Sequence, residues 1–546
     1  METCWLTGSQ IVIETLIEQG VTDVFGYPGG QVLSIYDELY KASDRINHYL
    51  TAHEQGAAHA ADGYSRVTGK VGVVIATSGP GATNLVTGIA TAMLDSIPMV
   101  AITGNVPTTQ IGTDSFQEIN ITGVTMPITK HNYFVTDVNE LSDILREAFK
   151  IAKSGRPGPV LVDIPKDVQL AVAPFVPRGV VEPYPKELVD EATIHEAVKL
   201  INQSKKPYIY VGGGAAGAGI GKDIIELAER TDAYIGCSFM GLSAIPHSHP
   251  RFLGMQGMHG KYSSSLASKN ADLLIGVGVR FSDRSTGVRS DGTRPAIIQL
   301  DADLAEINKN VKVDVGLVGD IAHSLKRITE CCKKQTHKQW HSVIEGYTEY
   351  KAVIDEKLTP QSIFGIINAA KDDDTVVVTD VGQHQMWTAQ YISLEKERRF
   401  ASSGGLGTMG YGLGAAIGAR IASGSKTLLI TGDGSFGMNL TELATVVSYG
   451  LPIVIVLFNN GSLGMVRQWQ GMYYGGRYSN SELNRKTDFV KLAEAFGLSA
   501  CRVATAEEFK TAFENAINGD KPYLIDAVID IEEKVLPINT EDKKEV

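Results

Sequence analysis

Cysteine is scarce in this sequence, and long runs of a single charge sign are absent. The five cysteines are scattered, with no C-x-x-C pair and no metal-ligand spacing, which favours a reducing, cytoplasmic location. The net charge of −12 is spread along the chain, so no nucleic-acid partner and no anionic membrane surface is expected.

Long apolar runs are also lacking. The run at 452–458 stops well short of the roughly 20 residues that cross a bilayer. The first ten residues lack the basic start and apolar stretch of a signal peptide. Glycine, by contrast, is abundant, with 57 residues in a chain of 546, and suggests many tight turns around ligands. The length predicts three or four domains.

The most informative stretch lies between residues 426 and 460. A β-type run at 427–431 turns at Gly432-Asp433-Gly434, and a helical pattern then continues to Gly450. A second β-type run at 452–458 ends in Asn459-Asn460. This order predicts a strand–helix–strand unit whose two strands are parallel neighbours.

Asp433 and Asn460 then fall at the carboxyl ends of those strands, where open α/β sheets bind ligands. With the backbone carbonyl of Ser462 they predict a hard oxygen site for Mg²⁺, completed by phosphate oxygens. Gly434 and Ser435 are small enough for a diphosphate to approach the next helix. Gly-Asp-Gly alone is more often just a turn, and the spacing to the paired asparagines makes the site more specific.

The N-terminal part repeats this pattern. A small-residue helix, an apolar strand, a Gly-rich turn and an asparagine occur at 63–84 and again at 412–439, which predicts two similar α/β domains. Glu54 stands at a strand-to-helix junction. Buried there, it could share a proton with a ring nitrogen, or it could simply favour the helix N-terminus.

The middle of the chain follows a proline-rich linker between residues 174 and 185. Gly212-Gly213-Gly214 and Asp301, each after a predicted strand, would suit a dinucleotide, although triple glycines are commonly loops. Near the start of the last domain, Gln383 and His384 follow another predicted strand. They could bind phosphate, or the histidine could be structural.

Nine stretches together resemble the acetohydroxyacid synthase (acetolactate synthase) family of thiamine diphosphate (ThDP) enzymes: HEQGAAHAADGYSR, TSGPGATN, GTDSFQE, SGRPGPVLVDIPKD, GMHG, VGQHQMW, GGLGTMGYG, GDGS…NN and GMVRQWQ. The resemblance runs from about residue 6 to residue 537. It implies an α/β fold with three doubly wound parallel-sheet domains. The expected domains are a pyrimidine-binding domain at 1–172, a central FAD-binding domain at 190–335, and a diphosphate- and Mg²⁺-binding domain at 358–546.

The resemblance also implies the reaction and the partners. Pyruvate is decarboxylated on ThDP, and the hydroxyethyl unit passes to a second pyruvate or to 2-oxobutyrate, in branched-chain amino-acid biosynthesis. The expected cofactors are ThDP, Mg²⁺ and FAD. The expected assembly is a homodimer or a dimer of dimers in which two chains share each ThDP, with Glu54 reaching in from the partner, and a small regulatory subunit is expected.

The resemblance assigns roles to individual residues. The residues expected in catalysis are Glu54, Gln117 and Lys166. Those expected to bind cofactors are Gly29, Gly30, Pro80, Asn84, Gly382, Gln383, His384, Gly407, Met409 (the apolar wedge that bends ThDP), Gly434, Ser435, Met465, Arg156, Gly212, Gly213, Gly214, Met258, His259, Arg280, Arg284, Asp301 and Asp320. The expected metal ligands are Asp433, Asn460 and Ser462, and the expected substrate contacts are Phe116, Met258, Arg284 and Trp469.

The chain departs from the family pattern at Ser282, which removes a carboxylate near the expected flavin, and at Ser115, where alanine is common. A ThDP oxidase of the pyruvate oxidase type and a simple decarboxylase share much of the site, but GMVRQWQ and GTDSFQE favour the carboligase. A regulatory or scaffold paralogue is disfavoured because it would need none of Glu54, Asp433 and Asn460.

Overall fold

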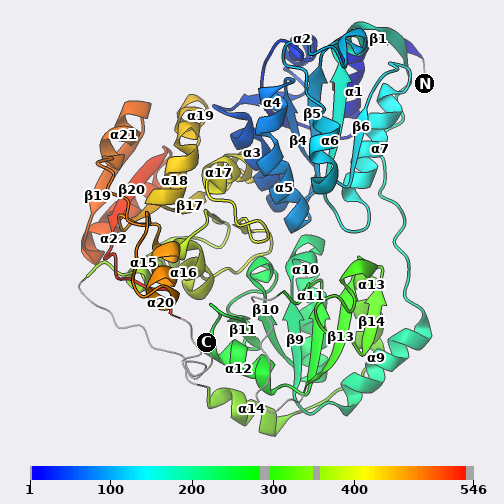
Figure 1. Cartoon of the computed structure of the whole chain (residues 1–546). Coiled ribbons are helices and arrows are strands. Elements are labelled where there is room, and N and C mark those ends of the chain that lie inside the picture. Colours follow the sequence, from blue (N-terminus) through cyan, green and yellow to red (C-terminus); the bar gives the residue numbers. More distant parts are fainter. Residues whose placement is uncertain (1–2, 283–293, 348–356, 537–546) are drawn as a thin grey trace.

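The computed structural model describes residues 3–282, 294–347 and 357–536. Three six-stranded sheets, each with helices on both faces, follow one another along the chain, and all pairings within them are parallel. In Figure 1 the N-terminal domain (blue to cyan), the central domain (green) and the C-terminal domain (yellow to red) are grouped around a common middle. This confirms the predicted fold class. The boundaries 1–172, 190–335 and 358–546 stay predictions.

The N-terminal sheet has its switch point, where the strand order reverses, between β2 and β4. In spatial order its strands are β3 (Asn47–Leu50), β2 (Asp23–Tyr27), β4 (Gly72–Ala76), β5 (Met99–Asn105), β7 (Pro159–Pro165) and β6 (His131–Phe134). Its helices are α1 (Gly8–Glu18), α2 (Leu33–Lys41), α3 (Glu54–Thr68), α4 (Pro80–Asn84), α5 (Val86–Asp95), α6 (Ile121–Thr125), α7 (Leu141–Lys153) and α8 (Lys166–Leu170). A short antiparallel pair, β1 (Cys4–Thr7) and β8 (Val172–Phe175), closes the domain.

The C-terminal sheet repeats this strand order, as the internal similarity predicts. Its strands are β16 (Phe400–Ala401), β15 (Val376–Thr379), β17 (Thr427–Gly432), β18 (Ile453–Asn459), β20 (Tyr523–Val528) and β19 (Ser499–Val503). Its helices are α15 (Pro360–Ala370), α16 (Gln383–Tyr391), α17 (Tyr411–Ser423), α18 (Asp433–Asn439), α19 (Leu443–Ser448), α20 (Gly464–Tyr473), α21 (Phe489–Phe496) and α22 (Ala506–Asn518). The predicted pairing of β17 with β18 is confirmed. The single helix predicted up to Gly450 is wrong, because the 3₁₀ turn η5 (Leu440–Glu442) separates α18 from α19.

The central sheet has a different order, with its switch point between β9 and β12. Its strands are β11 (Phe252–Met255), β10 (Tyr234–Cys237), β9 (Pro207–Val211), β12 (Leu273–Val277), β13 (Ala296–Asp301) and β14 (Val315–Val318). Its helices are α9 (Glu191–Gln203), α10 (Gly213–Ala218), α11 (Gly221–Thr231), α12 (Tyr262–Asn270), α13 (Ile321–Cys331) and α14 (Lys338–Glu345). This is the 3-2-1-4-5-6 order of dinucleotide-binding sheets.

The N- and C-terminal domains share one hydrophobic core, built where α3 packs against α17. Glycines make this approach close. A Cβ on Gly63 would overlap the carbonyl of Ala415, and one on Gly418 would overlap that of Ala60. The packing therefore fixes the start of α3, and Glu54 with it, against the C-terminal domain.

Helix length and hydropathy give no sign of a membrane span: within the described ranges, no helix is both long and apolar enough to cross a bilayer.

Candidate active site

A cavity opens at the carboxyl ends of β15, β17 and β18, beside the switch point of the C-terminal sheet. It is lined by Val381, Gly382, Gln383, His384, Trp387, Met409, Gly432, Asp433, Gly434, Ser435, Phe458, Asn460, Ser462, Leu463, Gly464, Met465 and Val466. All three expected metal ligands and seven of the expected cofactor-binding residues are in this set. The structure thus brings these residues together around one cavity, while the role of each residue stays a prediction.

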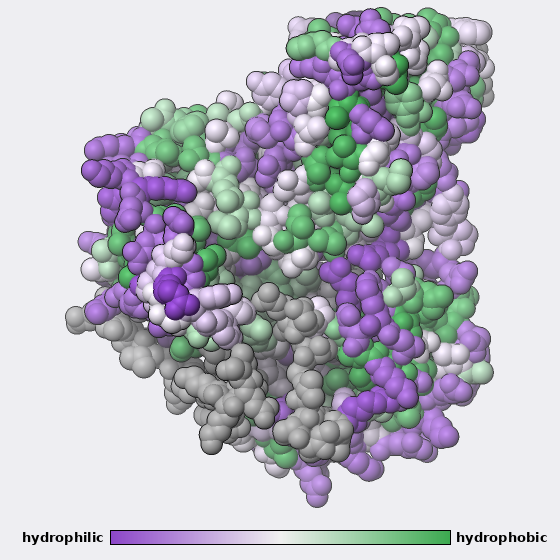
Figure 2. Space-filling model, viewed as in Figure 1, coloured by the Kyte–Doolittle hydropathy of each residue, from purple (hydrophilic) through white to green (hydrophobic). Residues whose placement is uncertain are grey.

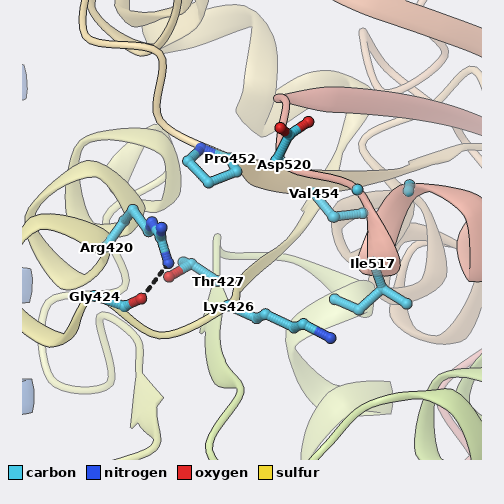
Figure 3. A pocket seen from close by; sticks show the side chains of 10 residues that line it. Arg420, Gly424, Lys426, Thr427, Pro452, Val454, Ile517 and Asp520 are labelled. Carbon is cyan, nitrogen blue, oxygen red and sulfur yellow. Dashed lines mark hydrogen bonds between the residues drawn. The ribbon is translucent and has the colours of Figure 1, made fainter.

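A larger cavity of about 270 Å³ lies at the amino ends of the same strands, between the ends of α17 and α22 (Figure 3). Arg420 reaches across its wall and donates hydrogen bonds to the carbonyls of Gly424 and Ser425. None of the expected site residues lines it. Because ligands of open α/β sheets bind at the carboxyl ends of strands, we place the active site in the smaller cavity.

Asp433 is the first residue of α18, and its Oδ1 accepts a hydrogen bond from the N–H of Gly434 at 3.0 Å. Burial raises the pKa of the Asp433 carboxyl to about 6, against the opposing effect of backbone N–H groups. Across the cavity, Asn460 Oδ1 accepts from the N–H of Ser462 at 3.1 Å. The two side-chain oxygens thus come from the ends of neighbouring strands, and oxygens are the ligands that a hard cation takes.

Two polar atoms in this cavity are buried without a hydrogen-bond partner: Ser462 Oγ and His384 Nε2. Burial lowers the pKa of His384 to about 3, so the imidazole is neutral and Nε2 can donate or accept according to its tautomer. Buried polar atoms are normally satisfied, so these two fit a polar ligand with oxygen acceptors and donors of its own. Within the described ranges, no cluster of three or more His, Cys, Asp or Glu side chains suits a metal. The Asp433 set has one carboxylate and needs oxygens from the ligand.

Other expected residues are held by the protein. Gln383 accepts from Asn460 Nδ2 at 3.2 Å and donates to Gln468 Oε1 and to the carbonyl of Glu533. Ser435 Oγ donates to the carbonyl of Val381 at 2.7 Å. These two side chains shape the cavity, and their hydrogen bonds orient the strand-end loops around it.

Glu54 lies in a second cluster, near the carboxyl ends of the N-terminal strands. It is the first residue of α3, and its Oε2 accepts a hydrogen bond from Asn84 Nδ2 at 2.9 Å. A Cβ on Gly81 would lie 3.2 Å from Glu54 Oε1, so the glycine leaves that oxygen room. Gln117, in a left-handed conformation with φ of 64°, packs against Gly79 in the same loop region.

Four further expected residues of the N-terminal domain lie in or near this region. Gly29 packs on Thr77, whose hydroxyl accepts from the N–H of Gln31 at 3.2 Å. Gly30 follows it, and Pro80 begins α4. Lys166 begins α8 after β7 and is half-buried. They place the switch point of this sheet beside Glu54.

The two clusters are separate within one chain. No hydrogen bond or ion pair joins Glu54 to a residue that lines the cavity, as far as the described residues show. Phe116, next to Gln117, is 84% exposed. Val124 in α6 and Met126, the residue after that helix, are also exposed. Figure 2 shows hydrophobic residues gathered on the visible face of the N-terminal domain, around α6. An exposed apolar area of this kind is typical of a protein interface.

At the switch point of the central sheet, the three expected glycines allow a close approach between the start of α10 and the end of β12. The N–H groups of Gly212 and Gly214 donate to the carbonyls of Val277 and Gly278 at 3.0 Å, and a Cβ on Gly212 would overlap Gly278. Gly213 packs against Met240. Gly212 is the N-cap of α10, and Gly213 and Gly214 are its first residues, so this glycine stretch begins a helix and is not a loop.

The acidic residues expected there have different surroundings. Asp301 ends β13, and burial raises its pKa to about 6. Asp320 caps α13, with its Oδ1 accepting from the N–H groups of Ala322 and His323. Its helix-capping role was missed in the sequence, although an Asp just before a helical run is a recognised signal.

The basic residues expected near the flavin converge on the end of α5. Arg156 Nε donates to Ser96 Oγ at 2.8 Å, and its Nη1 lies 3.1 Å from Glu306. Arg280 Nη1 donates to the carbonyl of Leu94 at 2.8 Å. Arg156, of the N-terminal domain, thus reaches Glu306 of the central domain, and Arg280, of the central domain, reaches Leu94 of the N-terminal domain.

The remaining expected residues are spread out. The carbonyl of His259 accepts from Gln390 Nε2, Met258 is 44% exposed, and Trp469 in α20 packs on Tyr473 at a ring distance of 5.2 Å. Gly407 lies in the loop that leads to Met409 and has φ of 69°, a conformation that favours glycine. Arg284 lies outside the described residues.

Several buried acids were not singled out in the sequence, and Glu442 is one of them. Glu442, in η5, is fully buried and accepts hydrogen bonds from the backbone N–H groups of Ala52 and His53. A single charged residue among Leu440, Leu443 and other apolar neighbours was the available signal, because acids are rarely fully buried unless they are paired or hydrogen-bonded.

Three family models match the chain, one for each sheet. They are the N-terminal TPP binding domain (residues 6–124), the central domain (194–328) and the C-terminal TPP binding domain (380–527) of thiamine pyrophosphate enzymes. The acetolactate synthase large subunit of Corynebacterium glutamicum is 46% identical, over 98% of this chain and 88% of its own. The acetolactate synthase isozyme 2 large subunit of Escherichia coli is 43% identical over 98% of this chain and 97% of its own. The acetolactate synthase of Arthrospira platensis is 44% identical over 98% of this chain and 96% of its own.

Proposed function

Because this chain belongs to the acetolactate synthase family of thiamine diphosphate-dependent enzymes, we propose an assignment of its residues to cofactors, substrates and partners. The activity is that of a carboligase. It decarboxylates pyruvate and joins the two-carbon unit to a second pyruvate, giving 2-acetolactate, or to 2-oxobutyrate, giving 2-aceto-2-hydroxybutyrate. The products are those of branched-chain amino-acid biosynthesis.

The observation that carries the assignment is the pair of buried, unpartnered atoms, Ser462 Oγ and His384 Nε2, in the cavity beside Asp433 and Asn460. We assign the diphosphate of ThDP to this cavity. Asp433, Asn460 and the carbonyl of Ser462 would hold Mg²⁺ against the diphosphate oxygens. When bound, ThDP supplies the electron sink that takes up the electron pair left behind when a 2-oxo acid loses CO2.

Glu54 would hold a proton at a ring nitrogen of the pyrimidine, and the hydrogen bond from Asn84 fixes one of its oxygens for that task. Because Glu54 and the cavity form separate clusters in one chain, a homodimer in which each chain completes the site of the other accounts for both. The exposed Phe116 and the apolar surface near α6 support an interface there.

FAD is proposed for the central domain, supported by its strand order and by the glycine-lined switch point. Both half-reactions move carbon groups and no net electrons, so the flavin should be structural and stay oxidised. A small regulatory partner is proposed because several relatives are named large subunits. A cytoplasmic location is supported by cysteines that are all unpaired.

Product analysis tests the assignment. The protein, supplied with ThDP, Mg²⁺ and FAD, should convert pyruvate alone to 2-acetolactate, and pyruvate plus 2-oxobutyrate to both products. The flavin absorbance should not change during turnover. Acetaldehyde as the main product would instead indicate a simple decarboxylase, and peroxide with bleaching of the flavin by pyruvate would indicate an oxidase.

A further inference from the structure

Glu442 connects the segment that follows α18 to the residues that precede Glu54 in the same chain. It lies in η5, directly after α18, the helix whose first residue is the expected metal ligand Asp433. Its side chain crosses to the N-terminal domain. Oε2 accepts from the N–H of Ala52 at 3.1 Å, and Oε1 accepts from the N–H of His53 at 3.0 Å.

Both donors immediately precede Glu54. His53 is the N-cap of α3, with its own Nδ1 accepting from the N–H of Gln55 at 3.0 Å. Gly56 makes the approach of the Glu442 carboxylate possible, because a Cβ at this position would overlap Oε1. The backbone that carries Glu54 is thus held on a buried carboxylate of the other domain.

The hydrogen bonds suit an ionised Glu442. Both oxygens are acceptors, and Oε2 accepts additionally from Thr445 Oγ1 at 2.6 Å. Burial raises the pKa of the Glu442 carboxyl, while the bonds from Thr445, Ala52 and His53 work against that shift. The N-terminus of α3 adds a favourable dipole for the negative charge.

A second contact lies along the same segment. The N–H of Leu50 donates to Tyr449 Oη at 2.8 Å, and the ring of Tyr449 packs on Tyr49 at 5.1 Å. Tyr449 follows α19, the helix after η5. The segment 442–449 therefore contacts the segment 49–56 through the residues at both of its ends, Glu442 and Tyr449.

We propose that Glu442 is a positioning residue for Glu54 and links the cofactor-binding end of α18 to the proton-handling carboxylate of the same chain. The inference rests on the proposed function. In the proposed dimer the two ends of this link serve different active sites, so Glu442 connects the two sites through covalent and hydrogen-bonded structure.

A double-mutant cycle tests the positioning role. Glu442→Gln keeps the size but turns an N–H donor group toward Ala52 or His53, so the segment should shift. We expect kcat at saturating ThDP and Mg²⁺ to fall about 10- to 100-fold, the range that a displacement of about 1 Å can cause. If Glu442 acts through Glu54, the double variant with Glu54→Gln should be no more than about threefold slower than Glu54→Gln alone.

A multiplicative loss in the double variant would overturn the proposal, and so would an unchanged kcat in Glu442→Gln. Glu18→Gln is the matched control. Glu18 also accepts several hydrogen bonds, two of them from the Arg146 guanidinium, but these two join α1 and α7, so its loss should lower stability and leave kcat unchanged. If Glu442→Gln does not fold, Glu442→Asp keeps the charge with a shorter reach and should show a smaller loss with the same non-additivity.

Mixed dimers test the link between sites. A chain with Asp433→Ala and a chain with Glu54→Gln should together form one intact site, with Glu54 from the first chain and the metal ligands from the second. Adding Glu442→Gln to the first chain should lower this activity 10- to 100-fold, and adding it to the second should change it less than threefold. Equal losses would overturn the link. Failure of the parent mixture to regain activity would instead count against the shared-site dimer itself.

Discussion

The N- and C-terminal domains have the same strand order but carry different chemistry at the same place. In each, ligand-facing residues follow the strands beside the switch point. The C-terminal domain places buried polar atoms there, with Asp433, Asn460 and a neutral His384 around one cavity. The N-terminal domain places small residues there, and one half-buried carboxylate, Glu54, beside them.

The difference shows that the fold sets where a ligand binds, while the residues at the strand ends set what each domain does with it. We assign anchoring of the cofactor to the C-terminal domain and proton transfer to the N-terminal domain. The first assignment predicts a loss of cofactor binding when its key residue is changed, and the second predicts a loss of turnover.

The largest effect is expected from Asp433→Ala. The proposed metal site has no other carboxylate, so its remaining ligands would be neutral and Mg²⁺-dependent binding of ThDP should be lost. Calorimetric titration with ThDP at fixed Mg²⁺ should show no binding in the range where the unmodified protein saturates. Unchanged affinity would remove Asp433 from the anchoring role.

Glu54→Gln should distinguish the roles of the two domains most clearly. The variant loses a proton-transfer partner and keeps a side chain of the same size, so kcat should fall by about 10²- to 10⁴-fold. The affinity for ThDP should stay within a few-fold of that of the unmodified protein, in contrast to Asp433→Ala. Near-normal turnover would contradict the assignment of proton transfer to the N-terminal domain.

Trp469→Leu tests whether the C-terminal domain also determines the preference between the two acceptor substrates. Trp469 is in α20, just beyond the cavity residues Met465 and Val466, and the family resemblance places it against the extra methyl of 2-oxobutyrate. One methyl group supplies only about 1–3 kcal/mol of discrimination, so the preference over pyruvate should fall by at most about 10- to 200-fold.

Competition between both acceptors measures this ratio directly, and the first decarboxylation should be nearly unchanged. Tyr473→Leu is a control in the same helix, because Tyr473 packs on Trp469 and lies one turn further from the cavity residues. It should change the ratio less. An unchanged product ratio in Trp469→Leu would leave the tryptophan with a structural role.

The features best predicted from the sequence are those set by residues close together in the chain. The spacing from Asp433 to Asn460 lies within one strand–helix–strand unit, so local pattern was enough to bring both to one sheet edge. Short strands such as β6 (HNYF) and β19 (SACRV) were missed, because neither has an apolar run to mark it. The role of Glu442 was also missed, because its partners Ala52 and His53 are 390 and 389 residues away.

The smallest predicted effect is a pH dependence that belongs to one domain only. Burial holds the pKa of the Asp433 carboxyl at about 6, and a metal ligand must be ionised to bind. From about one pH unit above this pKa the carboxyl is almost fully ionised, so this group should no longer change the affinity for Mg²⁺. Below pH 6 the proton competes, and the affinity should fall about tenfold for each pH unit.

Titration of Mg²⁺ at fixed ThDP between pH 5 and pH 8 would measure this slope. Glu54→Gln should give the same curve, because Glu54 belongs to the other cluster. Asp433→Asn should bind weakly and show a smaller break near pH 6, since only the diphosphate then titrates at the metal. A break that keeps its full size in Asp433→Asn but disappears in Glu54→Gln would reverse the division of labour between the two domains.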